Sequence, residues 1–172
     1  MLTNKARFAI FAVALVLAGW SVYQQVYEIT ALITGGILLL IHGYFKEGTV
    51  VLAAKAYHHK DFVKTEKLLK EIKNPDRLMR KRRGYFEYLY GNIELQKENF
   101  AEAERHFQIA SRFPLKNENE KGLILVQLAN LNLRKKEFEK ARAYASVAKD
   151  LQISARVKSI IENIEIQIEK AT

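Results

Sequence analysis

The sequence contains no cysteine. This absence excludes disulfide bonds, thiolate metal sites and cysteine nucleophiles. The chain also has no glycine-rich phosphate loop after a strand, and no pair of acidic residues in the setting of a general acid and base. Two of its four histidines, His58 and His59, are adjacent, so on a helix their side chains would diverge by roughly 100° and chelate poorly. The sequence therefore predicts a protein that is not an enzyme and that holds no metal or cofactor.

Charged residues are almost absent from Phe8 to Phe45 and are dense after Lys46. The first 45 residues have a net charge of +1, so the remaining residues carry +8 of the total of +9. A basic balance of this kind suits partners such as anionic lipid, an acidic protein surface or nucleic acid. It carries no information about the fold.

Two apolar runs, residues 6–23 and 29–45, lie in this part of low charge. As a helix the second run would be roughly 26 Å long, which is close to the hydrocarbon core of about 30 Å. Trp20 and Tyr23 stand at the end of the first run, as membrane-interface anchors do. We therefore expect residues 1–45 to form a transmembrane helical hairpin. A cleavable signal peptide is the alternative for the first run, but a second run follows at once.

The orientation of this hairpin is predicted by its flanking basic residues. Lys5 and Arg7 flank the first run, Lys46 and Lys55 follow the second, and the loop between the runs has no positive charge. Because cytoplasmic loops carry an excess of lysine and arginine, both termini would face the cytoplasm. The expected localisation is an integral membrane protein, in a bacterial inner membrane, with the repeat domain cytoplasmic.

Small residues recur four positions apart in both runs. Ala14 pairs with Ala18 in the first run, and Ala31 pairs with Gly35 in the second. Such pairs allow helices to approach closely in a membrane. They would pack the hairpin against itself or dock it against another membrane subunit.

One sequence pattern occurs three times at a spacing of 38 residues. The copies are "HHKDFVKTEKLLKEI" (58–72), "QKENFAEAERHFQIA" (96–110) and "RKKEFEKARAYASVA" (134–148). From Gly48 onward the apolar residues recur at helical spacing, and short polar breaks separate helix-sized segments. The pattern therefore predicts successive helical hairpins that stack on one another.

The positions that the copies share resemble the tetratricopeptide repeat family. The middle copy matches best, with Gly91, Phe100, Ala103, Phe107, Ala110 and Pro114 on or next to the family positions. The resemblance covers about residues 48–153. Two features depart from the family: the expected tryptophan is Thr49, Glu87 or Leu125 here, and the period is 38 rather than 34. A generic helical bundle is the alternative.

The expected fold is therefore all-α, with a two-span hairpin followed by a three-repeat α-solenoid. The repeat domain would span residues 46–172, with repeats at about 48–76, 84–115 and 121–153. A capping helix at 154–171 would hide the apolar edge of the last repeat. This helix carries its apolar residues on one stripe, which would otherwise bind a partner helix: Val157, Ile160, Ile161, Ile164 and Ile168.

The tetratricopeptide resemblance implies a peptide-binding groove lined by the first helix of each repeat. An asparagine amide there would pair with the N–H and C=O of a bound backbone, and tyrosines would supply contact area with few rotatable bonds. A lining of tyrosine, asparagine and arginine suits a polar or acidic segment. Carried over by position, the groove residues are Tyr57, Tyr85, Tyr88, Asn92, Gln96, Asn130 and Arg134.

The strongest charge run comprises Arg77, Arg80, Lys81, Arg82 and Arg83. As the solvated start of a helix it needs no partner. As a polybasic patch it would bind anionic lipid, at about 1 kcal/mol per basic residue, or an acidic partner. As a nucleic-acid footprint it lacks interleaved aromatic residues and a known motif, so nucleic acid is not an expected partner.

These observations support three hypotheses about function. The leading one is a non-enzymatic, membrane-anchored adaptor that binds a protein partner at the cytoplasmic face of a membrane complex. The second is a structural accessory subunit that is held constitutively in such a complex by its transmembrane hairpin. The third is a sensor of anionic lipid surfaces. None of them involves a small-molecule substrate.

Overall fold

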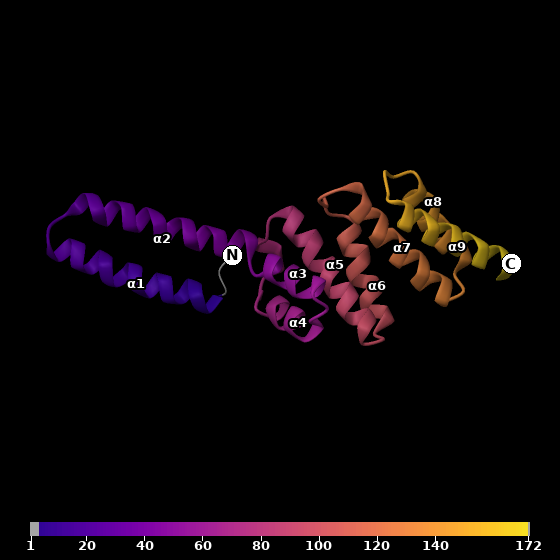
Figure 1. The fold of residues 1–172 in the computed structure, drawn as a ribbon, viewed down its shortest axis with the longest axis horizontal. Helices are drawn as coiled ribbons and strands as arrows, with labels where there is room; N and C mark the ends of the chain where they lie inside the picture. The colour runs from indigo at the N-terminus through magenta and orange to yellow at the C-terminus, as the bar shows by residue number, and fades with distance from the viewer. Residues whose placement is uncertain (1–3, 172) are drawn as a thin grey trace. The chain divides into compact units, whose positions relative to one another are not determined.

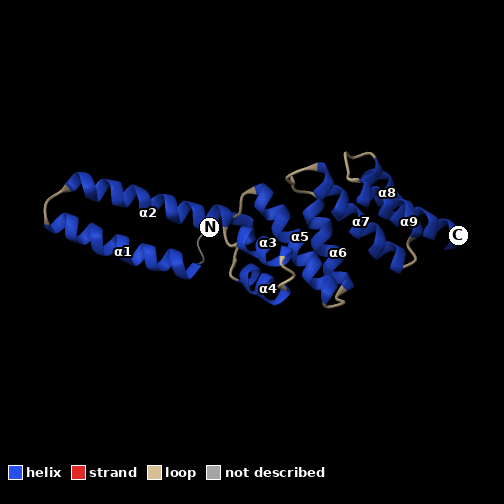
Figure 2. Cartoon of the chain, viewed as in Figure 1, coloured by secondary structure: helices blue, strands red, loops and turns tan. Residues whose placement is uncertain are grey.

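A computed structural model describes residues 4–171 of the protein (Figure 1). The side chains of residues 4–8 and 44–47 lie outside the described part, and these include Lys5, Arg7 and Lys46 of the expected charge bias. Within the described residues every regular element is helical, which confirms the all-α prediction (Figure 2). In chain order the elements are α1 (Asn4–Tyr23), α2 (Tyr27–Glu47), α3 (Val50–His58), α4 (Phe62–Lys70), η1 (Pro75–Arg77, a 3₁₀ turn), α5 (Arg80–Gln96), α6 (Phe100–Ser111), α7 (Glu118–Arg134), α8 (Phe138–Lys149) and α9 (Ala155–Ala171).

Helices α1 and α2 run antiparallel and are joined by a tight turn (Figure 1). Gln25 adopts a left-handed conformation in this turn, with φ of 58°. The buried Ser21 hydroxyl donates a hydrogen bond to the Val26 carbonyl at 2.8 Å, and the Thr30 hydroxyl donates to Ser21 Oγ at 3.1 Å. These hydroxyl groups satisfy the polar atoms where the chain reverses direction.

The two-span membrane anchor predicted for residues 6–23 and 29–45 is not supported by the structure. Crossing a hydrocarbon core takes about 20 consecutive, mostly apolar residues in one helix. Among residues 4–171, no helix combines the necessary length with the necessary apolar character. The sequence estimate used the full extent of both runs, including residues 44 and 45, whose side chains lie outside the described part. This finding overturns the expected integral membrane localisation, with its cytoplasmic termini and repeat domain.

The chain divides into two compact units, which meet between Met79 and Arg80. The first unit contains the α1–α2 hairpin together with the α3–α4 helix pair. The second unit contains the pairs α5–α6 and α7–α8 and the final helix α9.

The first helix of each pair ends in the same turn. Lys60, Glu98 and Lys136 adopt left-handed φ values of 59°, 62° and 61° at equivalent places. In each turn this residue donates its N–H to the carbonyl three residues earlier, at 2.8–3.0 Å, and the next N–H donates to the carbonyl five residues earlier, at 2.9–3.0 Å. These paired bonds define a Schellman motif. The 38-residue spacing of the sequence therefore reappears as a repeated backbone geometry.

Small residues lie where the two helices of a pair approach closely. A Cβ atom added at Gly91 would come within 2.7 Å of the Phe107 ring, so α5 and α6 pack at a distance that only glycine permits. In the first pair Thr65 replaces the alanine of the later copies and is fully buried. Its hydroxyl donates to the Asp61 carbonyl at 2.7 Å, which explains how a polar residue is tolerated there. The other small residues of this set, all fully buried, are Ala53, Ala103, Ala129 and Ala141.

Helix α9 covers the last helix pair. Its buried residues Val157, Ile161, Ile164 and Ile168 join the apolar cluster formed by α7 and α8. A Cβ atom added at Gly122 would come within 2.5 Å of Ile153, so the segment before α9 also packs tightly on α7. The apolar stripe is thus occupied by the chain itself, and it does not offer a surface to a partner helix.

Candidate functional site

Four of the predicted groove residues lie on one face of α5, because they are spaced by three or four residues. Tyr85 and Tyr88 are half-buried, and their rings lie 5.7 Å apart at an interplanar angle of 35°. The Tyr88 ring also lies 6.3 Å from that of Phe107, which anchors it to the core. The two tyrosines therefore form a fixed aromatic pair that is still partly open to solvent. Gln96, the last residue of α5, is exposed.

The two asparagines that the repeat makes equivalent differ in the structure. Asn92 is buried, and its Nδ2 donates to the Tyr88 carbonyl at 2.7 Å, so its amide is engaged by its own helix. Asn130 on α7 is half-buried, and its side-chain amide makes no hydrogen bond within the described residues. Asn130 is therefore the one of the pair that has an amide available for a ligand backbone.

Arg134, the last residue of α7, stacks on Phe100, the first residue of α6. Its guanidinium carbon lies 3.9 Å from the ring centroid, within the range of a cation–π interaction. The guanidinium forms no ion pair within residues 4–171, so its N–H donors remain open to a ligand. This contact also places the end of α7 beside the turn that follows α5.

Tyr57, the remaining predicted groove residue, belongs to the first unit. Its ring packs edge-on against Phe62, with centroids 5.8 Å apart. Burial raises the pKa of the Tyr57 hydroxyl above its ordinary value. The structure thus brings Tyr85, Tyr88 and Asn92 together on α5 and links Arg134 to the neighbouring turn, while Tyr57 lies in a separate unit.

The basic stretch from Arg77 to Arg83 is not uniform. Arg77 lies in η1, and the other four residues form the first turn of α5. Arg80 and Lys81 are exposed, whereas Arg83 is largely buried and pairs with Glu87 Oε1 at 2.9 Å. Its guanidinium also lies over the rings of Phe86 and Phe113. Arg83 is therefore a packing residue and is not a surface charge.

Sequence reasoning missed a buried polar cluster around Glu87. Glu87 is 2% exposed, and its Oε2 atom lies 2.5 Å from His106 Nδ1. The His106 ring is stacked on Tyr90, with centroids 5.2 Å apart. The signal was present in the sequence, since Glu87 occupies the position where the repeat family has an apolar tryptophan. A charged residue at a core position predicts buried partners.

A second cluster of this kind joins α6 to α7. The buried Glu104 accepts hydrogen bonds from Asn132 Nδ2 at 3.2 Å and from Lys135 Nζ. Asn132 Nδ2 also donates to the Leu128 carbonyl at 2.8 Å. Three side chains from two helices thus satisfy most of one another's polar atoms inside the unit. Their role in the described structure is to join the helix pairs.

The small residues of the α1–α2 hairpin are placed differently from one another. Ala14 and Ala18 are half-buried, whereas Ala31 and Gly35 are exposed. A Cβ atom added at Gly35 would meet nothing within 4 Å. The second pair of small residues therefore does not serve close packing within the hairpin.

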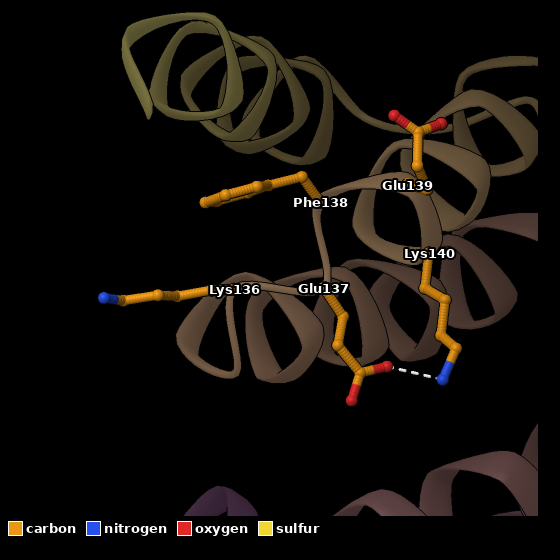
Figure 3. A pocket seen from close by; sticks show the side chains of 5 residues that line it. All are labelled: Lys136, Glu137, Phe138, Glu139 and Lys140. Carbon is orange, nitrogen blue, oxygen red and sulfur yellow. Dashed lines mark ion pairs between the residues drawn. The ribbon is translucent and has the colours of Figure 1, made fainter. Parts of the chain in front are cut away.

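A shallow, open hollow lies over the turn between α7 and α8 (Figure 3). It is lined by five consecutive residues, 136–140, and Glu137 pairs with Lys140 across it at 2.5 Å. The hydrogen bond from Lys140 lowers the pKa of Glu137, and the same contact raises the pKa of Lys140. Both groups are exposed to water, and nothing in the hollow converges on a bound molecule.

Neither the hollow nor the buried clusters has the make-up of a metal centre. Among the described residues no group of three histidine or acidic side chains lies close enough together to hold a metal ion. No protein family, curated protein or solved structure matches the chain. The tetratricopeptide resemblance therefore stays a prediction from the residues.

The arrangement of α5 and α7 offers several groups of the kind that contact a ligand. It presents a tyrosine pair, an amide without a partner and a guanidinium held by ring stacking. These groups donate hydrogen bonds and supply contact area, which are the properties of a recognition surface. We define the recognition face as Tyr85, Tyr88, Gln96, Asn130 and Arg134.

Proposed function

We propose that the protein is a non-enzymatic helical-repeat module, similar to tetratricopeptide arrays, that binds a segment of a partner protein. The repeated Schellman turns and the buried small residues at equivalent places support the repeat assignment. The proposed binding site is the recognition face on α5 and α7. The α-solenoid of three repeats and a capping helix remains part of this proposal.

The observation that carries the proposal is the half-exposed pair Tyr85 and Tyr88. Buried aromatic side chains are ordinary core, but these two rings are only half-buried. The Tyr88 ring packs on Phe107, and the Tyr85 ring packs on Tyr88. Rigid, partly exposed tyrosines are enriched where proteins bind one another, because little side-chain entropy is lost on binding. Asn130 and Arg134 add donors that a peptide backbone or an acidic side chain would accept.

The test is site-specific photo-crosslinking in cells. A photoreactive residue at position 85 should capture one defined partner protein, while the same residue at Val147, which is exposed on α8, should not. Combining Tyr88→Ala with Asn130→Ala should abolish capture from position 85 while leaving the helical circular dichroism unchanged. Asn92 is unsuitable for this purpose because its amide bonds within α5. Equal capture from both positions would contradict a specific recognition face.

A second candidate function is that of a structural subunit, held in a protein complex by the α1–α2 hairpin. The observation that favours it is the exposure of large apolar side chains there, including Val16 at 73%, Leu32 at 78% and Leu39 at 74%. A helix that is apolar on all sides is normally buried, and large exposed apolar patches mark interaction sites. In this function the exposed apolar side chains of the hairpin would be covered by another protein.

Gly35 provides a clean test of the second candidate. Because a side chain at this position meets nothing in the chain itself, Gly35→Leu should leave the hairpin intact. If the hairpin docks on a partner through this side, the substitution should release the partner in co-purification. If the partner is lost instead in the Tyr88→Ala, Asn130→Ala protein, the recognition face carries the interaction.

A further inference from the structure

The second unit carries basic side chains at one end that belong to two separate segments. Arg80, Lys81 and Arg82 begin α5, and Arg112 and Lys116 lie in the connection between α6 and α7. Arg82 is half-buried, and the other four side chains are exposed. We call these five residues the basic surface.

Tight packing brings the two segments together. A Cβ atom at Gly84 would come within 2.8 Å of Phe113 Cβ and 3.3 Å of Leu115 Cδ2, so the α6–α7 connection lies directly on the first turns of α5. The Arg83 guanidinium over the Phe113 ring reinforces this contact. Arg112 and Lys116 flank the packed residues Phe113 and Leu115 in the sequence, so the chain carries them close to the start of α5. The run of basic residues in the sequence therefore supplies only three of the five residues of the surface.

Three carboxylates on α5 and α7 that lie near these residues in the chain are engaged by other donors. Glu87 is held by Arg83 and His106. Glu120 Oε2 accepts a hydrogen bond from the Lys116 backbone N–H at 3.0 Å, and Glu118 accepts one from the Gln152 N–H at 2.6 Å. Within the described residues, none of the five side chains of the basic surface forms an ion pair. Their charges are therefore left for a partner to neutralise.

The position of these charges is unfavourable for the fold itself. The first turn of α5 has no acidic residue, although the start of a helix carries a partial positive charge and is stabilised by anions. If these cations served only solubility, the fold would be more stable with them in the last turn of a helix, where the helix dipole is negative. Cations at the start of a helix lower its stability, and such departures from local stability are expected at functional sites.

We propose that the basic surface binds an acidic segment of a partner protein. Three of its five residues are arginines, whose planar forks match the carboxylates of an acidic segment in bidentate pairs. The surface shares no residue with the recognition face, and the variants that test the two proposals differ, so either proposal stands if the other fails. Phe113, the aromatic ring at the centre of the surface, lies under Arg83 and offers no platform on which nucleic-acid bases would stack.

The experiment measures the binding of a fluorescein-labelled oligoglutamate peptide to the full chain by anisotropy, with oligoglutamine of the same length as reference. The test variant combines Arg80→Gln, Arg82→Gln and Arg112→Gln. The matched control combines Arg156→Gln, Lys158→Gln and Lys170→Gln, which removes the same charge from exposed, unpaired positions on α9. Circular dichroism of both variants checks that the helices persist.

The wild-type chain and the α9 control should bind oligoglutamate with equal affinity, and the test variant should bind about tenfold more weakly. Raising the salt concentration should weaken wild-type binding and narrow this difference. An equal loss in both variants would show a mere effect of net charge and overturn the proposal. Failure to bind oligoglutamate would also overturn the proposal. A parallel measurement uses vesicles of phosphatidylglycerol with phosphatidylcholine, and salt-sensitive binding to these vesicles without binding to the peptide would overturn it as well.

Discussion

Replacing Lys136 by glycine is expected to stabilise the second unit. Lys136 holds a φ of 61° in the turn between α7 and α8, a conformation that costs a residue with a Cβ atom about 1–2 kcal/mol. Glycine removes this cost, but its greater freedom in the unfolded chain offsets about 0.4–1 kcal/mol. The Lys136 side chain is exposed and forms no ion pair within the described residues, so little else is lost. The net gain should be about 0.5–1 kcal/mol.

Urea denaturation followed by circular dichroism would measure this gain as a higher midpoint with an unchanged slope. Ala143→Gly is the matched control, because Ala143 is exposed in the interior of α8. There glycine should lower the free energy of unfolding by about 1 kcal/mol. Glu98→Gly, at the equivalent turn of the preceding pair, should behave like Lys136→Gly. If Lys136→Gly instead loses as much stability as Ala143→Gly, the repeated left-handed turn is not the conformation that the chain adopts.

Three further predictions concern single side chains. Glu87→Ala would leave Arg83 and His106 without their shared carboxylate, so it should lower the free energy of unfolding in urea by about 3–5 kcal/mol. Glu139 pairs with Arg142 at the exposed surface, so Glu139→Ala should lower it by less than about 1 kcal/mol. Gly91→Ala should cost about 1–3 kcal/mol by calorimetry because its methyl group meets the Phe107 ring, while Gly35→Ala, which meets open space, should not destabilise the chain. The pKa of Glu137 is lowered in the folded chain, so its contribution to stability is present above its unfolded pKa and is lost as the pH falls through its folded pKa. Lys140→Ala should raise the folded pKa of Glu137, measured as the midpoint of a carboxyl NMR titration. An unchanged midpoint would refute the assigned contact.

The helical character of the chain was predictable because it depends on local periodicity. Apolar residues at helical spacing, interrupted by short polar breaks, indicated the helix pairs without any knowledge of their packing. The equivalence of Phe62, Phe100 and Phe138 likewise follows from the sequence, and each of them opens the second helix of a pair. The left-handed residues in the turn within each pair were not predicted, since Lys60, Glu98 and Lys136 are not the glycines that usually mark such turns.

The site was less predictable because it depends on which partner each side chain finds. Asn92 and Asn130 are equivalent in the repeat, yet only the structure shows that the amide of Asn92 bonds to its own helix. Arg80, Lys81 and Arg82 form no ion pair within the described residues. Arg83, in contrast, pairs with Glu87 one turn later, a spacing that could have been read in advance. The Glu87–His106 contact joins residues on two helices, so the charged residue at a core position indicated a buried partner without identifying it.

The membrane prediction was wrong for a related reason. It rested on the length of two apolar runs counted in the sequence and on aromatic residues at their ends, and these do not establish the uninterrupted apolar helix that a membrane crossing needs. The described parts of α1 and α2 do not form such a helix.

The contacts of the second unit follow the order of the chain. Helix α5 packs on α6, α6 on α7 and α7 on α8, and α9 closes the series by packing on α7 and α8. When a chain of this kind is pulled by its two ends, the outermost element can detach without disturbing those beneath it. Under tension the unit should therefore lengthen in steps from its C-terminal end. The first step would peel away α9 and open its isoleucine stripe to water, well before the buried Glu87 and His106 contact is strained.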